Sequence, residues 1–125
     1  MVSRQNSPLV NGEILLSQSL GSFSGATAHV YLEDVSLQDD SANVITEQSI
    51  SNIDHEAGIE NRVAFSLHSE HGEIAKPIAM YSVRVHITFH QDGRIHRGDY
   101  ISTESYPVLT QGYPSAVLVR VTAVK

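Results

Sequence analysis

The amino-acid sequence predicts an all-β domain made of two antiparallel sheets. Apolar and polar residues alternate with a period of two along most of the chain, which is typical of strands with one buried face. No stretch keeps a helical spacing of apolar residues over three turns. The alternation is clearest from Tyr81 to Phe89, and the Asp92-Gly93 pair that follows is a strong hairpin signal.

Seven strands follow from this alternation and from the turn residues between its runs. They are predicted at residues 9–17, 26–37, 43–53, 61–68 and 81–90, then directly after the Asp92-Gly93 turn, and at residues 116–124. Seven short strands with frequent turns fit a two-sheet antiparallel sandwich of immunoglobulin or transthyretin type. We expect residues 1–8 to form a flexible N-terminal segment and residues 9–125 to form a single domain.

Three of these strands carry more specific signals. In the second, the apolar residues change parity near Asp34, which predicts a β-bulge. The third is polar, as expected of an edge strand. In the fourth and fifth, Phe65 and Val85 fall on the inward face and are predicted core residues. Pro107 keeps the segment 106–110 out of a central strand, because proline cannot donate to the ladder.

The fifth and sixth strands are predicted to form a tight hairpin. Asp92-Gly93 between alternating strands predicts a two-residue type I′ turn with a positive φ at Gly93. Pairing about that turn places Val85 opposite Tyr100 and His86 opposite Asp99. We therefore expect His86 and Asp99 to form a cross-strand charge pair on an exposed sheet face.

Composition limits the range of functions. The net charge of −6 and the scattered basic residues argue against binding to nucleic acid or anionic lipid. The chain has no cysteine, which removes disulfides, thiol nucleophiles and a lipid-bearing thiol. Residues 1–8 lack the apolar core of a signal peptide, and no apolar run approaches the ~20 residues that cross a bilayer. The expected location is the cytoplasm, or another compartment after removal of a targeting segment.

No catalytic residue and no cofactor are predicted. His68 and His71 flank Glu70 and are the residues closest to a metal-binding pattern, but no third ligand is fixed by spacing. His86 and His90 lie on one strand face about 13 Å apart, too far to share one metal ion. The sequence therefore predicts no metal site and points to a binding domain rather than an enzyme.

Several segments in series resemble one protein family. They are Val30–Leu37, Val44–Gln48, Tyr81–Ile87, Asp92-Gly93 and Tyr106–Thr110. In this order they resemble the YbaY-like lipoprotein family, which includes the YscW-type lipoprotein chaperones, or pilotins, of type III secretion. The similarity runs from about Gly12 to Val124.

The resemblance implies a β-sandwich held in the bacterial cell envelope, whose pilotin members escort a secretin to the outer membrane. The matching residues carry over a fold rather than a catalytic site. Those expected to have structural roles are Asp34, Ser36, Tyr81, Asp92, Gly93, Tyr106 and Pro107. This chain differs from the family pattern because it contains neither a signal peptide nor a lipobox cysteine.

Two functional hypotheses result. The first is a non-enzymatic, chaperone-like domain that holds an extended protein segment, secretin-like by resemblance, in a groove or at an edge strand. The alternative is a small-ligand or carbohydrate-related envelope domain that binds metal weakly through His68 and His71.

Overall fold

The computed structural model describes residues 8–36, 43–68 and 78–125. Within these ranges the regular secondary structure consists of β-strands only. The strands are β1 (Val10–Leu16), β2 (Phe23–Asp34), β3 (Asn43–His55), β4 (Asn61–Leu67), β5 (Tyr81–Thr88), β6 (Tyr100–Ile101), β7 (Pro107–Val108), β8 (Ala116–Arg120) and β9 (Thr122–Ala123).

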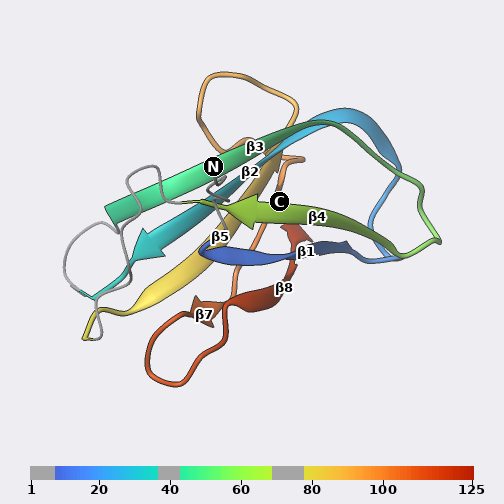
Figure 1. Cartoon of the computed structure of the whole chain (residues 1–125). Helices are drawn as coiled ribbons and strands as arrows, with labels where there is room; N and C mark the ends of the chain where they lie inside the picture. The colour runs from blue at the N-terminus through green and yellow to red at the C-terminus, as the bar shows by residue number, and fades with distance from the viewer. Residues whose placement is uncertain (1–7, 37–42, 69–77) are drawn as a thin grey trace, which may run out of the picture.

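The strands form two sheets that pack face to face, with the smaller sheet in front of the larger one (Figure 1). The smaller sheet has the order β4-β1-β8, and the larger has the order β3-β2-β5-β6-β9, with β7 also paired to β5. This arrangement confirms the predicted β-sandwich. One pairing differs from the prediction, because β1 and β8 run parallel. Side chains alternate in the same way in parallel and antiparallel strands, so the sequence pattern carried no information about direction.

Apolar side chains from both sheets fill the space between them. Phe65 is 3% exposed and Val85 is fully buried, so both predicted core residues are confirmed. The other fully buried large side chains are Val10, Ile14, Leu16, Leu32, Leu67, Ile87, Val30, Val83, Val108 and Val119. The alternation of these residues along each strand is what brings them to one side of each sheet.

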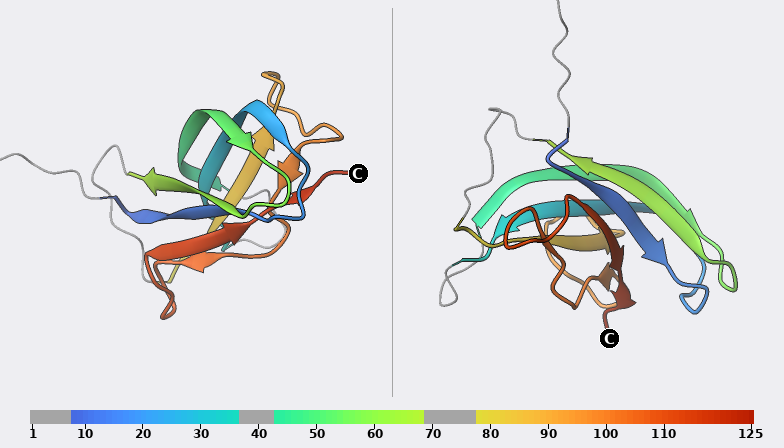
Figure 2. Two further views of the ribbon diagram at one scale, coloured as in Figure 1. Left: turned by 90° about the vertical axis from the view of Figure 1, so that its right-hand side faces the viewer. Right: turned by 60° about the horizontal axis from the view of Figure 1, so that its bottom comes forward.

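One continuous stretch of chain joins the two sheets along one side. The predicted strand 116–124 is divided at Val121, so that β8 belongs to the smaller sheet and β9 to the larger. This C-terminal stretch, in red in Figure 2, runs from the smaller sheet to the larger. The hydroxyl of Tyr106 accepts a hydrogen bond of 2.9 Å from the backbone N–H of Arg120, at the point of crossing.

On the opposite side of the sandwich two edge strands face each other, and the turn at residues 56–60 joins them at one end. β3 ends the larger sheet and β4 ends the smaller, which confirms the predicted edge position of the third strand. Side chains bridge the two edges: Gln48 Oε1 accepts from the Ser66 N–H at 2.7 Å, and Asn61 Nδ2 donates to the Asp54 carbonyl at 3.3 Å. We call this junction the β3–β4 seam.

The pairing of β2 with β3 contains irregularities that bend the larger sheet. A register shift between Leu32 and Glu33 lies close to the bulge predicted at Asp34, with the extra residue on the partner strand β3. A second extra residue of β3 lies between Ile50 and Ile53, where Asn52 has a φ of 59°. Such bulges interrupt a flat edge, which limits uncontrolled pairing with other chains.

The predicted tight hairpin is wrong. β5 ends at Thr88 and β6 begins at Tyr100, and Ile87 rather than Val85 lies opposite Tyr100. Gly93 has the predicted positive φ of 77°, but Asp92 does not share it, so the turn is not type I′. The chain forms a longer connection over residues 89–99, which we call the 89–99 loop.

We predict that Gly12→Ala destabilises the fold strongly. Gly12 lies in β1 between Phe65 of β4 and Val117 of β8, and a Cβ there would collide with the Val117 carbonyl oxygen and approach Phe65 Cζ to 2.9 Å. Forcing a side chain into such a packed site typically costs about 1–3 kcal/mol. Urea denaturation of both proteins measures the loss.

Gly21→Ala is the matched control, because a Cβ at Gly21 would meet no atom within 4 Å. Its free energy of unfolding should stay within about 0.5 kcal/mol of wild type. Equal effects of the two substitutions would contradict the close approach of β1, β4 and β8.

Candidate functional site

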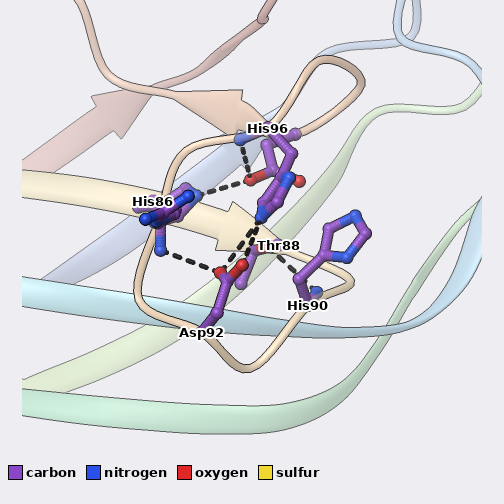
Figure 3. Close-up of polar contacts among 7 residues, drawn as sticks. His86, Thr88, His90, Asp92 and His96 are labelled. Carbon is purple, nitrogen blue, oxygen red and sulfur yellow. Dashed lines mark hydrogen bonds and ion pairs between the residues drawn. The ribbon is translucent and has the colours of Figure 1, made fainter.

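The outer face of the larger sheet carries polar and aromatic side chains that are able to bind a ligand. Along β2, His29 and Tyr31 alternate with the buried Ala28 and Val30, and so point away from the core. His86 lies opposite His29 on the neighbouring strand β5. The 89–99 loop arches over this face beside His86 (Figure 3).

A hydrogen-bonded ion pair holds the loop against the sheet. His86 Nε2 lies 2.7 Å from Asp99 Oδ2, and the side chains are only 5% and 1% exposed. The backbone N–H of His96 donates to the same carboxylate oxygen at 2.9 Å. The predicted contact between His86 and Asp99 is confirmed, but its predicted exposure is wrong, because Asp99 reaches His86 from the loop that covers it.

The surroundings of Asp99 favour its charged form. Burial raises the pKa of the carboxyl group, but hydrogen bonds from the His86 side chain, the His96 backbone and the Thr88 hydroxyl outweigh it and hold the pKa below its usual value. The pKa of Asp92 is also lowered, first by the backbone N–H of Arg94 and then by the His96 side chain. The loop therefore carries two carboxylates that are charged at neutral pH.

Four histidines gather at the loop and the adjoining face. The rings of His90 and His96 stack with centroids 3.9 Å apart, and His96 Nε2 lies 2.9 Å from Asp92 Oδ2. The centroids of His29 and His86 are 6.2 Å apart. This gathering was not predicted, because it depends on the return of the 89–99 loop over the sheet rather than on spacing within one strand.

Beside these rings the surface is hollowed. This outer-face hollow has a volume of about 420 Å³, within the size range of small-ligand sites. It is lined by residues of β2, β3, β5 and the 89–99 loop: Thr27, His29, Tyr31, Glu47, Ser51, His86, Thr88, His90, Gln91 and Gly93. The lining combines aromatic rings with hydroxyl, amide and carboxylate groups, so the hollow offers both ring faces and polar atoms to a ligand.

The metal candidates from the sequence are not brought together. Within residues 8–36, 43–68 and 78–125, no three His, Cys, Asp or Glu side chains are arranged to hold a metal ion. His68 is exposed at the end of β4. His71 lies outside the described residues.

Asp34 and Ser36 connect two neighbouring strands. Asp34 Oδ1 accepts hydrogen bonds from the backbone N–H and the hydroxyl of Ser36, at 2.9 and 2.6 Å. The Ser36 hydroxyl oxygen in turn accepts from the Met80 N–H at 2.8 Å. These contacts join the end of β2 to the beginning of β5, and Tyr81, which follows Met80, is paired with Asp34 and largely buried.

Tyr106 and Pro107 lie at the other side of β5. Pro107 pairs with Ser82 in the two-residue strand β7, and the Ser82 hydroxyl accepts a hydrogen bond from the Tyr106 N–H. The Tyr106 hydroxyl reaches Arg120 where β8 crosses to β9. All these contacts are local to the framework, and the structural role expected for the set stays a prediction.

Comparison with known protein families places this fold among secretion chaperones. Residues 5–121 match the family described as type III secretion system lipoprotein chaperone (YscW). The chain belongs to this family. The resemblance noted in the sequence is thereby confirmed.

A solved structure has the same fold. It is the structure of an alternative pilotin from the type II secretion system of Vibrio cholerae, with 23% sequence identity and a TM-score of 0.61. The likeness covers 90% of this chain and 95% of the pilotin. No curated protein sequence matches significantly. In the parts of the chain that the structure describes, no helix has the length and apolarity needed to cross a membrane.

Acid should reveal the role of Asp99. Because its folded pKa is lowered, its contribution to stability is fully present above the unfolded pKa near 3.9 and is lost as the pH falls through the folded value. We expect Asp99→Asn to lower the free energy of unfolding by about 1.5–3 kcal/mol at pH 7, since hydrogen bonds to a charged group are lost. Urea denaturation between pH 2.5 and 7 measures both proteins.

The difference between wild type and Asp99→Asn should shrink below about pH 4. Asp92→Asn is the control, because the Asp92 side chain is 48% exposed and its pairing should matter little. A difference that stays constant with pH would show that the Asp99 charge does not stabilise the loop.

Proposed function

We propose that this protein is a non-enzymatic pilotin-type chaperone that binds an extended segment of a secretin-like partner in the cell envelope. Family membership supports a chaperone of secretion systems. The observation that carries the proposal is the β3–β4 seam, where two long edge strands lie side by side without belonging to one sheet. Residues 9–125 act as one binding domain in this proposal.

The seam suits an extended peptide because edge strands offer unpaired backbone groups to an incoming strand. The Ser66 N–H supports this, since its acceptor is the Gln48 side chain of β3 rather than a residue of β1. In this proposal a peptide carbonyl takes the place of the Gln48 side chain as the acceptor. The polar sequence of β3 keeps the edge compatible with water when no partner is bound.

Bridging the seam should abolish partner binding. The chain has no cysteine, so Gln48→Cys with Ser66→Cys allows the two edges to be joined by a short bismaleimide. We expect the bridged protein to lose binding to the purified secretin subunit encoded in the same genome, measured by surface plasmon resonance. The double variant treated with N-ethylmaleimide is the control and should still bind. Undiminished binding by the bridged protein would rule out the seam as the docking site.

The Gln48 bridge should also contribute to stability. Gln48→Ala leaves the Ser66 N–H without its acceptor and should lower the free energy of unfolding by about 1–2 kcal/mol. Gln48→Glu keeps an acceptor oxygen and should remain close to wild type. Thermal and urea unfolding of the three proteins measures these differences. An unchanged free energy of unfolding in Gln48→Ala would mean that water replaces the Gln48 oxygen without loss of stability.

A further inference from the structure

The outer-face hollow is distinguished by its charge. Among the described residues that line it, Glu47 is the only acidic residue, and none is Lys or Arg. Glu47 has no hydrogen-bond or ion-pair partner among the residues that the structure describes. It lies directly opposite Tyr31 in the β2–β3 ladder, so its carboxylate stands beside an aromatic ring. An anion in the hollow would be repelled, whereas a cation would be attracted.

Aromatic rings extend from Glu47 across the face. The ring centroids of Tyr31 and His29 are 6.3 Å apart, and those of His29 and His86 are 6.2 Å apart. The faces of aromatic rings attract cations. The protein already uses this property, because the Arg84 guanidinium lies 4.2 Å from the centroid of the Tyr31 ring.

The protein's own cation does not oppose a second one strongly. Arg84 forms an ion pair of 2.8 Å with Glu33, whose side chain is 9% exposed, so its charge is neutralised locally. Behind the hollow, the charged Asp99 contacts His86. The charges of Arg84 and Asp99 therefore each have a partner, and among the described residues the Glu47 carboxylate is left as the unpaired charge of the hollow.

We propose that the outer-face hollow binds a cationic side chain, arginine or lysine, of the partner peptide, with Glu47 as its counter-ion. This inference rests on the proposed function, because the peptide that pairs with β3 would carry the cation. Alternate side chains of a strand paired with β3 point to the outer face, in the same row as Glu47 and Ser49. A long side chain opposite Glu47 can extend over β3 to the Tyr31 ring.

The proposal is tested first without any partner. N-acetyl-arginine amide is titrated into the ¹⁵N-labelled protein at pH 8. We expect saturable shifts of the amide signals of Thr27, His29 and Ser51. N-acetyl-citrulline amide has nearly the same shape without the charge and should bind about threefold to tenfold more weakly.

Two variants locate the counter-ion. Glu47→Gln should weaken arginine amide binding by about threefold to tenfold. Glu13→Gln removes the same charge from the other sheet, where Glu13 pairs with the exposed Arg62, and should leave binding unchanged. Equal binding of the arginine and citrulline compounds, equal behaviour of the two variants, or stronger shifts with maltose than with arginine amide would overturn the proposal.

The two proposals fail separately. The bismaleimide bridge across the seam could abolish secretin binding while Glu47→Gln leaves secretin binding unchanged. That result would support the seam as the docking site and contradict the hollow as a cation site. Arginine amide could instead bind through Glu47 while the bridged protein still binds the secretin. That result would support the hollow as a cation site and contradict the seam as the docking site.

Discussion

The passage of one continuous chain from β8 to β9 at Val121 fixes the two sheets relative to each other. Because the same stretch pairs with β1 in one sheet and with β6 in the other, neither sheet can shift without breaking the other's hydrogen bonds. The Tyr106 hydroxyl strengthens this junction by bonding to the Arg120 backbone. On the opposite side β3 and β4 belong to different sheets, and they are joined by the turn at residues 56–60 at one end and by the Gln48 bridge to Ser66 further along. The two sides of the sandwich therefore differ in how the sheets are joined, and the proposed docking surface lies on the side where no described strand pairs with both sheets.

Much of the fold could be predicted from local patterns in the sequence. Period-two alternation located the long strands and placed Phe65 and Val85 in the core, because burial of one sheet face imposes that spacing. The polar third strand was recognised as an edge for the same reason. Strand direction could not be predicted: the parallel pairing of β1 with β8 joins distant segments, and alternation does not encode it.

The candidate site was only partly predictable. The contact between His86 and Asp99 was predicted, but for a hairpin that does not form. Asp-Gly is a strong local turn signal, yet here the burial of the Asp99 carboxylate against His86 holds the chain in a wider path. Tertiary hydrogen bonds outweighed a local preference. The hollow and its histidines depend on that path, so no motif could have indicated them.

The parallel pair of β1 and β8 has a consequence for how the protein is made. Its partners lie about 100 residues apart in the chain, and contacts of such separation form slowly because a long loop must close first. During synthesis β1 and β4 must wait for residues 116–120 before the smaller sheet has its third strand. The domain can therefore complete its core only when nearly all of the chain has emerged. Until residues 116–120 have been made, the smaller sheet lacks its third strand, and the chain stays incompletely folded.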